Sequence, residues 1–153
     1  ALLTGRVTYD EMKDVDKTGL GGRYDVLEPL SDLEEYSETL KVTLDTLRNK
    51  DGRSEDALDF FRDYYAVIKQ VSRVTKSGQP VAWVVANRTM SRVNIPTHLI
   101  TRELCEHIGY EFGVNLPREI PNKTLPWENA PENIEGTKGN LMANENIVIL
   151  HAP

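Results

Sequence analysis

The residues best suited to bind a ligand lie in the segment from Asn87 to Arg102. Arg88, Arg92 and Arg102, with no acidic residue among them, give this segment a local charge of +3 in a chain whose formal charge is −6. A guanidinium pairs with phosphate oxygens in a fork geometry, so these arginines beside the amide of Asn87 suit an anionic ligand such as a phosphodiester. The alternative interpretation is that Arg88 and Arg92 are solvated loop charges.

A second candidate is the segment between Ile120 and Asn133, which is rich in proline and asparagine. Connections longer than about 12–15 residues in a compact domain are usually functional or disordered. Asn122, Lys123 and Trp127 bring an amide, a cation and an aromatic plane, which are groups that contact nucleotides. A structural interpretation stays open, in which the prolines stiffen a cover and Trp127 fills an edge of the core.

No residue of the chain is predicted to be a catalyst or a metal ligand. The three histidines, His98, His107 and His151, lack the four-residue spacing of a zinc-binding helix. The only cysteine, Cys105, has no second thiol with which to share a metal. The glycines at 19, 21 and 22 neither follow a strand nor open a helix, so they lack the context of a phosphate-binding loop.

Composition limits the class of protein. A length of 153 residues with 39% apolar residues is typical of one globular domain, and the acidic balance excludes a strongly basic nucleic-acid coat. One cysteine excludes a disulfide framework. The longest apolar run, Val81 to Ala86, is far shorter than the roughly 20 residues that cross a bilayer, and no secretion signal opens the chain. We therefore expect a soluble cytoplasmic protein without membrane contact.

Hydrophobic spacing predicts helices and strands that could position these residues. Residues 1–30 show no sustained period and are expected to form an irregular arm, ahead of one domain over residues 31–153. Apolar steps of three and four residues predict helices over 31–48, 54–75 and 97–108. Runs of strand-forming residues predict strands over 81–86, 110–120 and 147–150.

These elements predict an α/β layer structure. Strand 81–86 is apolar throughout and is expected to be central and buried on both faces of a mostly parallel sheet. The helix after it would lead over to strand 110–120 in a βαβ crossover, and residues 147–150 would add an antiparallel carboxy-terminal strand through a long hairpin loop. Three strands are few for this length, so further strands are expected to flank strand 81–86.

Several ordered segments resemble the carboxy-terminal half of bacterial site-specific DNA methyltransferases, which modify an exocyclic amino group of adenine or cytosine. They extend over about 90 residues from Phe60 to Leu150 and include the segment Val74-Thr75-Lys76-Ser77-Gly78-Gln79, Val84-Val85-Ala86-Asn87-Arg88-Thr89, Ile95-Pro96-Thr97, Ile120-Pro121-Asn122-Lys123 with Pro126, Asn129-Ala130-Pro131, and Glu145-Asn146-Ile147-Val148-Ile149-Leu150. The first of these segments is similar to the glycine turn that precedes the fifth strand of many methyltransferases.

The resemblance implies the rear half of a Rossmann-like methyltransferase sheet and a methyl transfer from S-adenosylmethionine to a base flipped out of double-stranded DNA. The family's tetrapeptide of the type (Asp, Asn or Ser)-Pro-Pro-(Tyr, Phe or Trp) is absent, because no two of the eight prolines are adjacent. Its glycine-rich cofactor loop is absent too. We therefore expect both motifs upstream, on an amino-terminal half of the same enzyme, with this chain inactive alone.

The resemblance puts the candidate site residues in matching segments without giving each a role. Asn87, Arg88 and Arg92 are expected at the strand end near the reaction centre, and Asn122, Lys123 and Trp127 on a loop facing DNA. No catalytic residue, cofactor-binding residue or metal site is assigned to this chain. Two alternatives remain: a catalytically empty assembly or binding module of a methyltransferase complex, and a methyltransferase that acts on RNA or protein.

Overall fold

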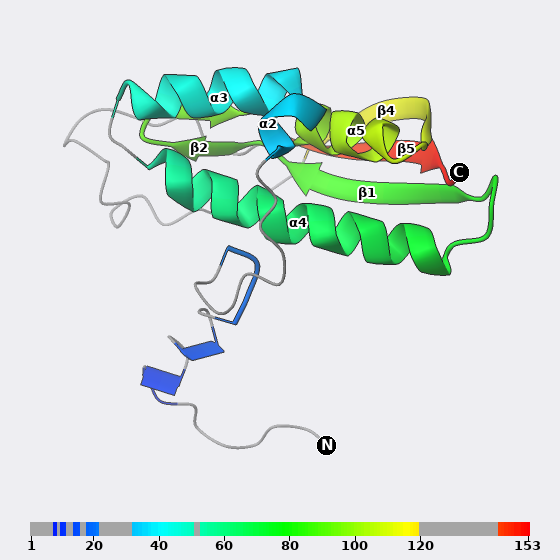
Figure 1. Cartoon of the computed structure of the whole chain (residues 1–153), viewed down its shortest axis with the longest axis horizontal. Helices are drawn as coiled ribbons and strands as arrows, with labels where there is room; N and C mark the ends of the chain where they lie inside the picture. The colour runs from blue at the N-terminus through cyan, green and yellow to red at the C-terminus, as the bar shows by residue number, and fades with distance from the viewer. Residues whose placement is uncertain are drawn as a thin grey trace.

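The computed structural model describes residues 8, 10–11, 14–15, 18–21, 32–50, 53–119 and 144–153. Figure 1 shows helices lying over a small sheet. In chain order the elements are α2 (Leu33–Tyr36), α3 (Glu38–Arg48), α4 (Ser54–Val74), β1 (Pro80–Ala86), β2 (Arg88–Met90), β3 (Val93–Ile95), α5 (Thr97–His107), β4 (Glu111–Glu119) and β5 (Asn144–His151). Most of the predicted arm, 1–30, lies outside the described residues, so the arm and its boundary stay predictions.

The predicted helices are confirmed, with one division. The first expected helix is two helices, α2 and α3, because Ser37 between them has an extended backbone with φ −143° and ψ 108°. The hydroxyl of Ser37 accepts a hydrogen bond from the backbone N–H of Leu40 at 3.0 Å and so caps α3. Serine competes with helical hydrogen bonding in this way, which explains why an unbroken apolar period does not produce one helix.

The carboxylate of Glu103 fixes this junction to α5. It accepts hydrogen bonds from the hydroxyl of Ser37 at 2.5 Å and from the backbone N–H of Thr39 at 3.1 Å. It also accepts one from the Thr39 hydroxyl. A single side chain of α5 therefore satisfies donors at the start of α3, where the positive end of the helix dipole favours an anion.

The larger sheet has the strand order β1-β5-β4, and both of its strand pairs are antiparallel. The expectation of a mostly parallel sheet is not met by the described strands, although the mixed α/β class is confirmed. The strands β1 and β4 run in the same direction, as the predicted crossover through α5 requires, but β5 lies between them and bonds to both. The carboxy-terminal strand thus occupies the place where a direct parallel pair would have formed.

The two faces of this sheet have different surroundings. Val81, Trp83 and Val85 of β1 pack against the buried core, and the Trp83 ring meets Tyr64 of α4 edge to face at 5.8 Å. The intervening residues Ala82 and Val84 are exposed, Val84 to 59%. The prediction that strand 81–86 is central and buried on both faces is therefore wrong for the described part of the chain, where β1 is an edge strand with one covered face.

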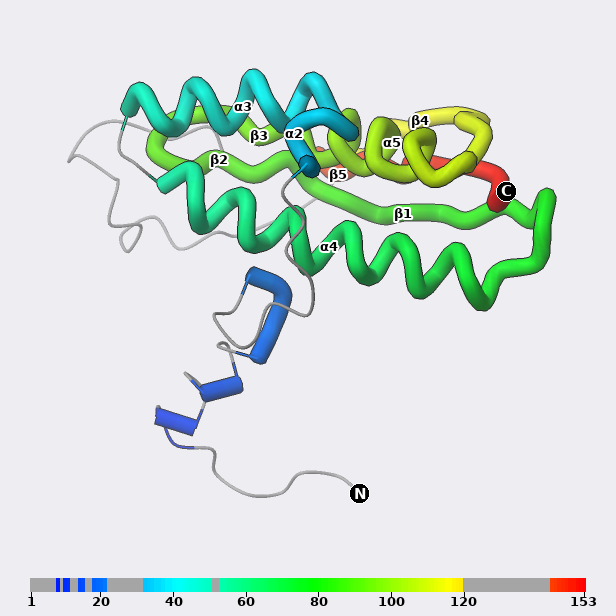
Figure 2. Tube along the Cα trace, in the orientation of Figure 1, coloured from blue at the N-terminus to red at the C-terminus, as the bar shows by residue number. Residues whose placement is uncertain are grey.

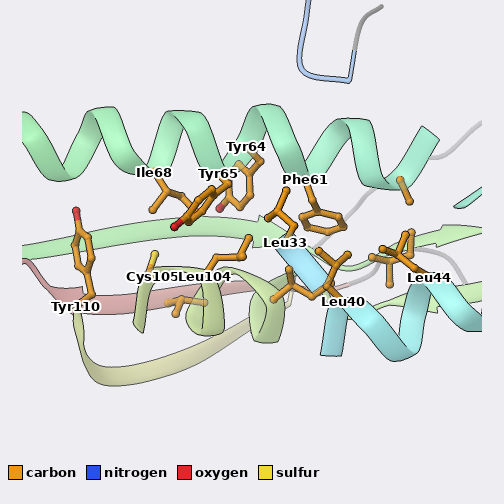
Figure 3. Close-up of a cluster of buried hydrophobic side chains, with 14 of the residues drawn as sticks. Leu33, Leu40, Leu44, Phe61, Tyr64, Tyr65, Ile68, Leu104, Cys105 and Tyr110 are labelled. Atoms are coloured by element: carbon orange, nitrogen blue, oxygen red, sulfur yellow. The ribbon is translucent and has the colours of Figure 1, made fainter. Parts of the chain in front are cut away.

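The core lies between the helices and the covered face of the sheet. Figure 3 shows Leu33, Leu40 and Leu44 from α2 and α3 gathered with Phe61 and Ile68 of α4. Leu104 and Cys105 of α5 and Tyr110 complete it in the same view, and Val148 and Leu150 are the contribution of β5. Packing of these side chains holds α5 and the sheet together, and the segment between β1 and α5 is anchored at both of its ends.

Candidate functional site

A β-hairpin occupies the segment between β1 and α5, where the sequence predicts neither a helix nor a strand. Its strands, β2 and β3, pair in the register Arg88↔Ile95, Thr89↔Asn94 and Met90↔Val93. Figure 2 shows the hairpin beyond the end of β1, with β3 beside α3. Each of these strands has only three residues, which is too short for an alternation of apolar and polar residues to distinguish a strand from a loop. The hairpin is held by tertiary packing.

The hairpin turns through Ser91 and Arg92, whose φ angles are +51° and +59°. Left-handed conformations at both central positions are the usual geometry of a two-residue hairpin, in which Asn-Gly is the favoured sequence. A side chain in this region costs on the order of 1 kcal/mol or more and persists only where the surroundings determine it. Here the buried side chains of Met90, Val93 and Ile95 hold the two strands against the core.

Two of the three arginines in this segment differ from the third in their surroundings. Arg88 and Arg92 are exposed, and neither has an ion-pair partner among the described residues. The Nε of Arg102 instead donates to Oε1 of Glu106 at 2.9 Å, and its guanidinium lies over the Phe112 ring at 4.1 Å from the centroid. The local charge free to attract an anion is therefore +2, carried by the hairpin, rather than the +3 counted from the sequence.

Asn87 has a different surrounding from the one expected of a ligand-binding amide. It is half-buried, and its Oδ1 lies 2.7 Å from Nδ1 of His98 on the first turn of α5. Because a carboxamide oxygen only accepts, Nδ1 of His98 carries the proton and donates it. Burial lowers the pKa of His98 below its ordinary value. This hydrogen bond connects the end of β1 to α5. Its two residues are eleven positions apart, and no pattern in the sequence indicates that they are in contact.

An apolar pocket of about 170 Å³ lies next to the hairpin. Phe60 and Phe61 of α4 and Ala86 of β1 line it, with Arg88 and Thr97 as its polar members. Aromatic and aliphatic walls suit a planar or aliphatic group, and the guanidinium at the side suits a negative charge. None of the described side chains that line this pocket is a carboxylate.

The remaining candidates divide into excluded and untested ones. Burial raises the pKa of the Cys105 thiol to about 12, so this group is not a nucleophile at neutral pH. No cluster of three or more potential metal ligands occurs within the described ranges. None of the helices found there is long and apolar enough to cross a membrane. Asn122, Lys123 and Trp127 lie outside the described residues, so their predicted role stays a prediction.

Comparison with known proteins gives one informative match. The chain is 36% identical over 146 residues to the Type II methyltransferase M.MvaI of Kocuria varians. The match covers 92% of this chain and 32% of the relative, so the chain spans about a third of that protein's length. No protein-family model matches, and no solved structure matches. The resemblance inferred from the sequence motifs is therefore confirmed.

Proposed function

We propose that this chain, which resembles a type II methyltransferase along nearly its whole length, is the carboxy-terminal part of a site-specific DNA methyltransferase. The complete enzyme transfers a methyl group from S-adenosylmethionine to an exocyclic amino group of adenine or cytosine, within the restriction-modification type of system. It acts in the cytoplasm, where its double-stranded DNA lies. The single observation that carries the proposal is the 36% identity over 146 residues.

The open face of the sheet supports the proposal that a further part of the enzyme covers this chain. In the strand register, Ala82, Ile149 and Val114 form one cross-strand row, and Val84, Ile147 and Leu116 form the next. Val84, Val114 and Leu116 are exposed to 59%, 41% and 47%. Contiguous apolar surface of this kind marks an interaction site. The amino-terminal half of the enzyme, as a preceding segment or a separate polypeptide, is the proposed occupant.

The chain's proposed contribution is to the DNA contact. Arg88 and Arg92 are exposed and unpaired in the described structure, so they can neutralise phosphates without first breaking an ion pair. Asn122, Lys123 and Trp127, on the connection between β4 and β5, are proposed to face the same DNA. Asn87 is assigned a positioning role instead, because its side-chain oxygen is already bonded to His98.

The described residues do not fit S-adenosylmethionine. The hydroxyls of a bound ribose usually meet a carboxylate beside a glycine-rich loop, and the pocket at the end of β1 has neither. When bound, S-adenosylmethionine would supply the methyl group, and a flipped base would receive it because a duplex hides the amino nitrogen. Cofactor binding and catalysis are therefore assigned to the upstream part, and no step of the transfer is assigned to this chain.

Reconstitution tests this proposal. The polypeptide encoded upstream of Ala1 is joined to this chain, and transfer of labelled methyl groups from S-adenosylmethionine to duplex DNA is measured. We expect an adjacent Pro-Pro-aromatic tetrapeptide upstream, and DNA labelling that falls in Arg92→Ala and Lys123→Ala while the melting temperature stays unchanged. If RNA or protein is labelled and DNA is not, the substrate is RNA or protein and the proposed DNA substrate is wrong. If no methyl group is transferred at all, the chain belongs to an assembly module without activity.

A further inference from the structure

The β2–β3 hairpin presents an uncharged polar pair on its outer face. Thr89 and Asn94 stand directly opposite each other in the register, and both are exposed. Side chains that are opposite in an antiparallel pair have Cβ atoms roughly 4.5–5.5 Å apart, so the hydroxyl and the carboxamide form one small surface. Neither group has a hydrogen-bond partner among the described residues, which leaves both free to bind a ligand.

One arginine stands beside this pair. Arg92 is exposed at the left-handed tip, two residues before Asn94, and has no ion-pair partner among the described residues. The side chain of Arg88 alternates with that of Thr89 and so shares the face of its cross-strand partner Ile95. The opposite face of the hairpin is buried through Met90, Val93 and Ile95. The hairpin is thus a ribbon fixed on one side, with a cation at its tip and two neutral hydrogen-bonding groups on its exposed face.

This arrangement matches the chemistry of a DNA groove. Cations contact the phosphates and set the register of a protein on the duplex, whereas neutral side chains read the base edges. The major groove, about 12 Å wide, admits a two-stranded β-ribbon. Asparagine bonds adenine through two atoms, and threonine contacts base edges through its hydroxyl or the thymine methyl group through its own methyl. The major groove of double-stranded RNA is too narrow for side chains to read.

We propose that the β2–β3 hairpin reads the recognition sequence, with Thr89 and Asn94 contacting base edges in the major groove of double-stranded DNA while Arg92 at the tip holds a flanking phosphate. This assigns specificity to Thr89 and Asn94, neither of which is among the candidate site residues of the sequence analysis. It rests on the proposed function, because the duplex is the substrate of the complete enzyme.

Mapping of methylated sites tests the reading step. The complete enzyme, consisting of this chain with its upstream part, is incubated with a library of randomised duplexes, and modified sequences are identified. Asn94→Ala and Thr89→Val each remove one set of hydrogen bonds at a single position of the site. The preference for the correct base at that position is expected to fall by roughly 5- to 150-fold, while the preference at the other positions of the site stays unchanged. Gln79→Ala is the matched control, because it removes an exposed amide at the opposite end of β1.

The phosphate contact needs a different variant. Arg92→Gly removes the guanidinium and places glycine, which adopts positive φ without strain, at the tip. We expect an unchanged or higher melting temperature, weaker binding to every duplex, and a salt dependence of log K against log salt that is shallower by about one. Lys76→Ala, which removes a cation from the turn before β1, should leave the slope unchanged.

The outcomes separate this inference from the proposed function. If the unmodified enzyme methylates defined DNA sites and Asn94→Ala and Thr89→Val modify the same sites with the same discrimination, the reading role is wrong and the proposed function stands. If Asn94→Ala lowers binding equally for all sequences, the pair contacts the backbone and the inference also fails. If the unmodified enzyme methylates no DNA, the proposed function itself fails.

Discussion

At the scale of single residues, hydrogen bonds to neighbours decided which candidates remain available for a ligand. Arg88 and Arg92 are exposed without partners in the described structure, whereas Arg102 is occupied by Glu106 and Phe112. Asn87 carries the same functional group as Asn94, but it is bonded to His98 while Asn94 is not. Residue type predicted the chemistry that each group could do. The partner within the fold decided whether the group could do it.

The burial of His98 makes stability depend on pH. Because burial lowers the pKa of folded His98 below about 6.5, the unfolded chain binds this proton more readily. The stability contributed by neutral His98 is complete above the unfolded value and is lost as the pH falls from about 6.5 through the folded pKa. Titration of the His98 ring protons by NMR should give a value below 6.5.

Replacement of the partner provides the control for this prediction. Asn87→Asp would place a carboxylate next to the imidazole, and an adjacent negative charge favours the protonated form. The pKa of His98 should therefore rise relative to that of the unmodified chain. An unmodified His98 that titrates at or above 6.5 would contradict the burial argument.

At the scale of elements, junctions and short strands determined the site more than the long helices did. The helix α4 followed directly from apolar spacing, but the junction at Ser37 depends on Glu103, which lies 66 residues away along the chain. The hairpin β2–β3 likewise depends on burial against other elements, because two strands of three residues each have little independent stability.

Removing the Glu103 carboxylate should destabilise the chain. Glu103→Ala leaves the hydroxyls of Ser37 and Thr39 and the Thr39 N–H without their acceptor, which should cost about 1–3 kcal/mol of unfolding free energy. Glu106→Ala, on the same helix, breaks only a largely exposed ion pair with Arg102 and should cost about 0.5 kcal/mol or less. Chemical denaturation of both variants measures the difference, and equal losses would show that the junction does not depend on Glu103.

At the scale of the whole molecule, the described sheet is covered on one face and open on the other. Its open face carries the cross-strand rows through Ile149 and Ile147, followed by an ion pair between Arg118 and Glu145. An apolar surface bounded by polar groups is typical of a region that another protein surface covers. The proposed upstream part of the methyltransferase has this role.

The open face should bind an apolar fluorescent dye. We expect dye fluorescence with the isolated chain, a decrease in Val84→Lys and Leu116→Lys, and its disappearance when the upstream part is added. Val42→Lys, which changes an exposed valine on α3 that lies beside Val93 and Asn94 of β3 and not on the open face, is the matched control and should keep the signal. Dye binding that persists in the complete enzyme would show that this face is not where the two parts meet.

The sequence by itself determined the helices, the three longer strands and the likeness to a methyltransferase, since each depends on local spacing or on short ordered motifs. The tertiary structure decided the strand order, the packing of the hairpin, the bond between Asn87 and His98, and the position of Arg102 over the Phe112 ring. These features arise from contacts between different elements: β5, the last strand in chain order, lies between β1 and β4. The spacing of hydrophobic residues carries no information about contacts between elements. The sequence therefore showed where the cationic segment lies, but it did not show which of its side chains the folded chain leaves available to a ligand.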